Sequence, residues 1–83
     1  MNTQHVDYAS ALREAFELSI DILGSSGKQA VIEEVVRAGV DIDSSYLSVD
    51  ELRNGLLQVL GVESADLIIR SVFKNLQKML EWK

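Results

Sequence analysis

The longest helical pattern in the chain is SADLIIRSVFKNLQKMLEW, residues 64–82. Its apolar residues recur at intervals of three and four, the spacing that places side chains along one face of an α-helix. Glu63 and Asp66 near the start and Lys78 near the end also suit the helix dipole. We therefore predict an amphipathic helix here, whose inward side chains are Ala65, Ile68, Ile69, Val72, Phe73, Leu76, Met79 and Leu80.

The segment before it carries the signals of another helix with defined ends. Ser48 and Glu51 have the spacing of a capping box, in which each side chain satisfies a free backbone N–H of the other residue. Gly61 suits the position after a helix, because glycine adopts the left-handed conformation. Gly55 costs this helix about 1 kcal/mol relative to alanine, so we expect close packing against another backbone there. The predicted apolar side chains are Val49, Leu52, Leu56, Leu57, Val59 and Leu60.

A further helical pattern covers residues 7–23 and is predicted to end at Gly24. Two apolar rows run side by side along it at helical spacing. The first row contains Ala9, Leu12, Phe16, Ile20 and Leu23. The second row contains Ala11, Ala15, Leu18 and Ile22. The width of this apolar stripe is large for so small a domain.

The pattern over residues 27–38 is also helical, with a capping box at Ser26 and Gln29 and a stop at Gly39. Its β-branched residues weaken helix propensity and leave a strand as the alternative, but their spacing favours a helix. The expected inward side chains are Val31, Ile32, Val35, Val36 and Ala38. Residues 40–47 are predicted to form a loop.

These patterns predict an all-α fold of four helices, in a chain of 83 residues without proline. Short connections between helices favour either a compact four-helix bundle or an orthogonal array, and the spacings are consistent with both. We expect residues 1–6 to form a flexible N-terminus and residues 7–83 to form a single helical domain.

The composition narrows the class of function. The formal net charge of −5 disfavours binding to nucleic acid or to an anionic membrane. No apolar run is long enough to span a bilayer, and the first residues lack the pattern of a signal peptide. We therefore expect a cytoplasmic protein with neither nucleic acid nor membrane as a partner.

The residues that most enzymes and metal sites need are scarce. The chain contains no cysteine, and its only histidine is His5. Nucleophilic triads and histidine-based or cysteine-based metal sites therefore lack their side chains. The sequence predicts no enzyme, no cofactor and no catalytic or metal-binding residue.

The stretch over residues 41–51 supports an alternative, a small acidic carrier-like or calcium-binding protein. It resembles an EF-hand loop, with Asp41 and Asp43 as the first oxygen ligands and Glu51 closing the loop. The turn glycine is missing, so Glu51 comes one residue early. Asp43 and Ser44 also resemble the Asp-Ser at which acyl-carrier proteins carry a phosphopantetheine arm. The simpler interpretation is a polar loop that caps the next helix.

Several residues mark a possible interface with a partner. Leu18, Ile22, Leu67 and Trp82 lie at the edges of the apolar stripes and are difficult to bury together in a monomer. Arg70, Lys74 and Lys78 form a basic row, and an acidic row contains Glu14, Glu17 and Asp21. We expect a homodimer, or another protein, to use this surface. Helices with three packed sides in a monomer, and charge rows that only face solvent, remain the alternatives.

The order of elements resembles the Nitrosopumilus output domain family of small archaeal modules. The stretches that carry the resemblance are residues 11–16, 23–28, 50–52, 56–61 and 65–80. Leu60 stands where the family usually has an aromatic residue before the glycine. The resemblance implies an archaeal, cytoplasmic, all-helical signalling output or adaptor domain, and it supplies no catalytic residue.

Overall fold

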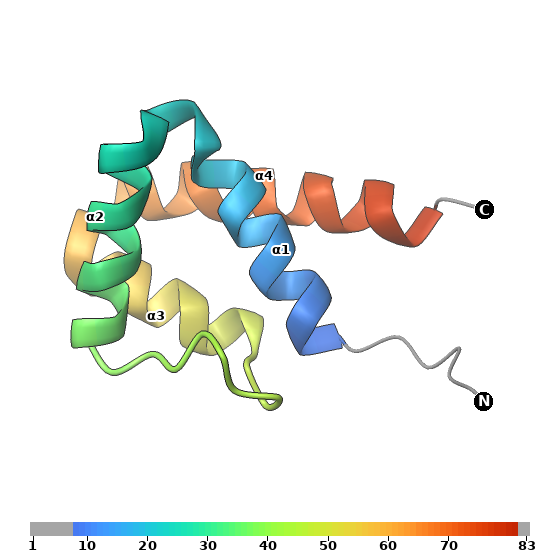
Figure 1. Cartoon of the computed structure of the whole chain (residues 1–83), viewed down its shortest axis with the longest axis horizontal. Coiled ribbons are helices and arrows are strands. Elements are labelled where there is room, and N and C mark those ends of the chain that lie inside the picture. The colour runs from blue at the N-terminus through green and yellow to red at the C-terminus, as the bar shows by residue number, and fades with distance from the viewer. Residues whose placement is uncertain (1–7, 82–83) are drawn as a thin grey trace.

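The computed structural model describes residues 8–81, which form four α-helices and one 3-10 turn (Figure 1). The predicted all-α fold is confirmed. The elements are α1 (Tyr8–Ile20), η1 (Asp21–Leu23), α2 (Gly24–Arg37), α3 (Val49–Leu60) and α4 (Val62–Glu81). The predicted flexible N-terminus and Trp82 lie outside the described residues, and the described side chains end at Met79.

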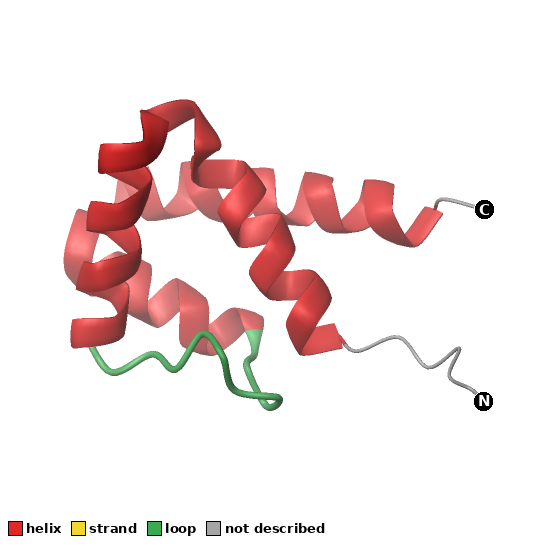
Figure 2. Ribbon diagram, in the orientation of Figure 1, coloured by secondary structure: helices red, strands yellow, loops and turns green. Residues whose placement is uncertain are grey.

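The helices cross one another, which corresponds to the array rather than to a bundle of parallel helices. Figure 1 shows α4 along the longest dimension, α1 crossing it diagonally, and α2 across the end where α3 turns into α4. The described part measures 40 × 22 × 22 Å. The loop between α2 and α3, green in Figure 2, passes below α1 and returns to the start of α3. The most extensive helix–helix contact joins α1 to α4.

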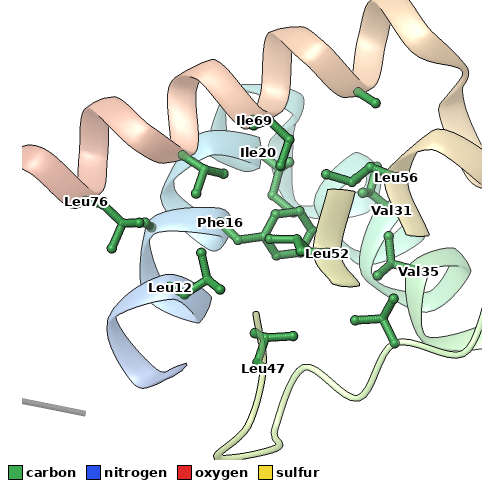
Figure 3. Packing of buried hydrophobic residues seen from close by; sticks show 14 of the residues in the cluster. Leu12, Phe16, Ile20, Val31, Val35, Leu47, Leu52, Leu56, Ile69 and Leu76 are labelled. Atoms are coloured by element: carbon green, nitrogen blue, oxygen red, sulfur yellow. The ribbon is translucent and has the colours of Figure 1, made fainter. Parts of the chain in front are cut away.

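One apolar core lies between these elements, and every helix and the long loop contribute to it. Phe16 of α1 is fully buried at its centre, close to Leu52 of α3 (Figure 3). Val40 and Leu47 anchor the two halves of the loop, since both are buried. The remaining buried members are Ala9, Leu12, Ala15, Ile20, Val31, Val35, Leu56, Ala65, Ile69, Val72 and Leu76.

The expected close packing at Gly55 is confirmed, but its partner is a side chain. A Cβ atom at Gly55 would lie 2.5 Å from Cγ2 of Val40 and 3.6 Å from Cγ1 of Val35. A methyl group does not fit there without displacing the loop. The glycine in α3 therefore lets the loop lie against that helix.

The start of α3 is as predicted. Ser48 has an extended backbone, and its Oγ accepts a hydrogen bond of 3.1 Å from the backbone N–H of Glu51. This is the serine half of the expected capping box. The helix ends at Leu60, and Gly61 follows it with φ of 85°. The predicted boundaries of this helix are confirmed at both ends.

The predicted connection between the first two helices is wrong. The first helix ends at Ile20 and continues as η1, and α2 begins at Gly24 rather than at residue 27. Ser26 therefore lies inside α2 and does not cap it. Gly24 has φ of 79°, so the expected positive-φ turn at this glycine is confirmed. Because α2 follows η1 without a loop, Ser26 lies two residues after the start of the helix and cannot occupy the cap position.

Two other side chains predicted to face inward are exposed. Val36 is 49% exposed and Phe73 is 51% exposed. Each belongs to an apolar stripe that is wider than the face its neighbours cover. On α2, the buried residues are Val31 and Val35. Val36 is one residue further along the helix, so its side chain lies beside the buried face. On α4, the buried positions near Phe73 belong to Ile69, Val72 and Leu76. The fourth helix also starts two residues earlier than predicted, at Val62.

Candidate interaction surface

A side-chain hydrogen bond, in addition to the apolar core, links α1 to α4. Ser19 donates a hydrogen bond of 2.7 Å from its Oγ to the backbone oxygen of Ala15, one turn earlier in α1. The same Oγ accepts a hydrogen bond of 3.1 Å from Nδ2 of Asn75 in α4. Both side chains are partly buried, so this bond marks the line along which the two helices meet. We call this line the α1–α4 seam.

Each helix presents one flank to the seam and the other flank elsewhere. On α1, Arg13 pairs with Asp43 of the loop at 2.9 Å, so the Arg13 flank faces the loop. Ala11 and Leu18, seven residues apart, lie on the flank nearer the seam. On α4, Phe73 borders α3, and Leu67 and Ser71 lie on the flank nearer the seam. Outer residues of both helices therefore belong to one surface.

We define this surface as the α1/α4 face. Its members on α1 are Ala11, Glu14 and Leu18, and its members on α4 are Leu67, Ser71, Lys74 and Lys78. Leu18 is 47% exposed and Leu67 is 66% exposed, so both leave a large apolar area in contact with solvent. Ile68 and Met79 of α4 are partly buried against the core.

Ile22 is more exposed than Leu18 and Leu67, the other described apolar residues of the predicted interface, at 89%. It lies in η1, one turn after Leu18, where Leu23 is also half exposed. The two side chains form an apolar corner between α1 and α2. The structure thus leaves Leu18, Ile22 and Leu67 exposed, as expected, and Trp82 lies outside the described residues.

Two members of the basic row, Lys74 and Lys78, lie on the α4 side of the face, and Arg70 lies nearer to α3. Arg70, Lys74 and Lys78 are all exposed, at intervals of one helical turn. None of them forms an ion pair with any residue whose side chain the structure describes.

The acidic row lies on the α1 side, and one of its members is already occupied. Asp21 Oδ1 accepts a hydrogen bond of 2.6 Å from Nζ of Lys28 in α2. This bond, together with the charges of Asp21 and Glu17, raises the pKa of Lys28 above its usual value against the opposing effect of desolvation. Glu14 is exposed and Glu17 is partly exposed. Glu14 is therefore the member of the acidic row that contributes a carboxylate to the α1/α4 face.

The loop over residues 41–51 uses its oxygen atoms within the chain. Asp41 Oδ1 accepts a hydrogen bond from the backbone N–H of Asp43, and Ser44 Oγ accepts one from that of Tyr46. The Asp43 carboxylate pairs with Arg13, and Ser48 caps α3. These bonds shape the loop and attach it to α1 and α3. Over the described residues, no three Asp, Glu, His or Cys side chains gather closely enough to hold a metal ion.

A groove of about 380 Å³ separates the start of α3 from the middle of α4. Its apolar lining comes from Val49, Ile69 and Phe73. The charged side chains along it are Asp50, Arg53, Asp66 and Arg70. Charges of both signs line this groove, so it has no single charge preference. The helical spacing of α4 predicts a buried Phe73, so the sequence gives no sign of this groove.

Comparison of the chain with protein-family models, with curated proteins and with solved structures yields no match. Within the described residues, no helix combines the length and the apolar character needed to cross a membrane.

Proposed function

We propose that the protein is a non-enzymatic helical interaction module that works as a homodimer through the α1/α4 face. The observation that carries this proposal is the pair of exposed leucines, Leu18 and Leu67, beside the α1–α4 seam. Large apolar side chains exposed on one face of a small domain are typical of protein–protein contacts. The exposed charges of Glu14 on α1 and of Lys74 and Lys78 on α4 add the polar rim that such contacts have.

The role that fits this module is a signalling output or adaptor domain in the cytoplasm. The proposal that it is not an enzyme is supported by the absence of cysteine from the whole chain and by the single histidine, His5. The net charge of −5 supports a protein rather than a nucleic acid as the partner. An archaeal source and kinship with the Nitrosopumilus output domain family remain part of this proposal, supported by the resemblance in sequence.

The test is the molar mass of the protein in solution, measured by light scattering after gel filtration over a hundredfold range of concentration. We expect about twice the chain mass of 9.2 kDa. Leu18→Glu should reduce the mass to that of one chain while the helical circular dichroism signal stays unchanged, because it buries a charge in the contact. Leu67→Glu should act in the same way from the other helix.

Val36→Glu is the matched control. Val36 is an aliphatic residue on α2 with nearly the same exposure as Leu18, 49% against 47%, but it lies outside the α1/α4 face. The dimer should persist in this variant. A monomeric parent protein at every concentration, or loss of association in Val36→Glu to the same extent, would contradict the proposed use of this face.

A further inference from the structure

The charges that line the groove between the start of α3 and the middle of α4 follow a definite order along it, and we call this groove the α3/α4 groove. Gly61 alone joins the two helices, and they run in opposite directions from this turn (Figure 1). Arg53 lies eight residues before Gly61, and Arg70 lies nine residues after it. The two arginines therefore lie at nearly the same level, on opposite walls of the groove.

An aspartate lies one helical turn from each arginine. Asp50 precedes Arg53 by three residues, and Asp66 precedes Arg70 by four. Because the helices run in opposite directions, Asp66 lies toward the turn at Gly61 and Asp50 lies toward the open end of the groove. The order of charges is thus negative, positive and negative, with both arginines in the middle. None of these four side chains forms an ion pair with another residue of the described chain.

The open end of the groove also offers an apolar contact. Val49 and Phe73 each lie twelve residues from Gly61, one on each wall, at the level of Asp50. Val49 is partly buried and Phe73 is 51% exposed, whereas Ile69, level with the arginines, is buried. A half-exposed aromatic ring beside charged groups is typical of the residues that anchor a protein partner.

From this order we infer that the α3/α4 groove binds an amphipathic helix of a partner protein that carries a carboxylate between two basic side chains, each one turn away. The carboxylate meets both guanidinium groups, the bases meet Asp66 and Asp50, and an apolar side chain beside one base meets Phe73. Intervals of one turn match the spacing of side chains on one face of a helix, and helices commonly dock in grooves of this kind. The inference goes beyond the α1/α4 dimer and does not require it, because the groove lies on the α3 flank of α4.

The two aspartates also determine which anions fit poorly. A nucleic acid or a run of acidic residues places further negative charges next to Asp50 and Asp66, and like charges in contact oppose binding. A single carboxylate avoids this repulsion and still forms charge-assisted hydrogen bonds with Arg53 and Arg70. The arrangement therefore favours an isolated acidic side chain over a polyanion.

The test is the binding of a synthetic helical peptide of about 16 residues to the full chain. The peptide is based on alanine and carries lysine, glutamate and lysine at intervals of four residues, with a leucine beside each lysine so that it fits in either direction. A second peptide has glutamine in place of the central glutamate. Fluorescence anisotropy should show about tenfold tighter binding of the glutamate peptide, because arginine bonds a carboxylate more strongly than a neutral amide.

Three variants show whether the groove is responsible. Arg53→Gln with Arg70→Gln should abolish the preference, so that both peptides bind about equally. Phe73→Ala should weaken both peptides alike and keep the preference, because it removes apolar contact and no charge. Arg37→Gln is the matched control, since Arg37 is an exposed arginine on α2 that pairs with Glu34 outside the groove, and it should change neither affinity nor preference. All the substituted side chains are exposed, so the helical circular dichroism signal should persist.

Equal binding of the two peptides by the parent protein, binding weaker than about 1 mM, or an unchanged preference in the double arginine variant would overturn the inference. Inorganic phosphate and a short single-stranded oligonucleotide are the competing ligands, and tighter binding of either would assign the groove to phosphate instead. The peptide titration and the molar mass are separate measurements. A monomeric parent protein that binds the glutamate peptide overturns the α1/α4 dimer alone, and a dimer that does not bind it overturns this inference alone.

Discussion

At the scale of single residues, Gly55 tests how closely the loop lies against α3. Gly55→Ala gains about 1 kcal/mol in helix propensity, but its methyl group would collide with Val40, 2.5 Å away. Overpacking a core costs about 1–3 kcal/mol, so we expect a net loss in the free energy of unfolding, measured by urea titration. Val40→Ala removes the obstructing methyl groups. The double variant should therefore lose less than the sum of the two single variants, and strict additivity would contradict this contact.

The Asp21–Lys28 pair predicts a change in titration. The Lys28 pKa is raised in the folded protein, so the stabilising effect of the pair is complete below the unfolded value of about 10.4 and is lost as the pH rises through the folded value. Asp21→Asn should lower the Lys28 pKa toward that usual value, which NMR of the side-chain nitrogen would detect. Glu34→Gln, which removes the partner of Arg37, should leave the Lys28 pKa where it is. An unchanged pKa in Asp21→Asn would contradict the hydrogen bond as its cause.

At the scale of the elements, two serines with similar sequence surroundings have different roles. Ser48 caps α3 through a bond to the Glu51 N–H, whereas Ser26 lies within α2. Ser48→Ala should lower the free energy of unfolding by about 1 kcal/mol. Ser26→Ala should leave it unchanged or raise it by about 0.5 kcal/mol, since alanine favours a helix interior. Equal losses in urea unfolding of the two variants would show that Ser26 does act as a cap.

The elements also show which parts of the fold could be predicted. The third helix was predicted with correct ends, because Ser48 and Gly61 are local signals that act within one turn. The start of α2 could not be predicted in this way, because the residues Gly-Ser-Ser-Gly at 24–27 resemble a loop. Their helical state depends on the preceding turn η1 and on the packing of Val31 and Val35 in the core. Local sequence does not contain that information.

At the scale of the whole molecule, the proposed dimer predicts a shape. The long axis of α4 lies along the 40 Å dimension, and the α1/α4 face runs beside it (Figure 1). Two copies stacked face to face should therefore thicken one of the 22 Å dimensions, with a largest dimension far below twice 40 Å. Small-angle X-ray scattering measures this directly. A particle close to 80 Å long would indicate an end-to-end dimer and contradict the use of this face.

The candidate surface was only partly predictable for a related reason. The acidic and basic rows follow from the spacing of charges in each helix, and the exposed Leu18 and Leu67 follow from the width of the apolar stripes. That Leu18 and the lysines of the basic row belong to one surface depends on how α1 crosses α4, which the spacing leaves open. Val36 and Phe73 were placed inside for the same reason, since their exposure depends on which neighbours cover them.

The Ser19–Asn75 bond joins residues 56 positions apart, and this separation affects when the surface forms. Contacts between distant parts of a chain form late, because the entropy of closing a long loop must be overcome first. We expect α3 and α4 to associate before α1 docks, so destabilising α1 should mainly speed unfolding, which stopped-flow kinetics would measure. A growing polypeptide on the ribosome therefore has no complete α1/α4 face until α4 has emerged, and newly made copies would pair only after each has finished folding.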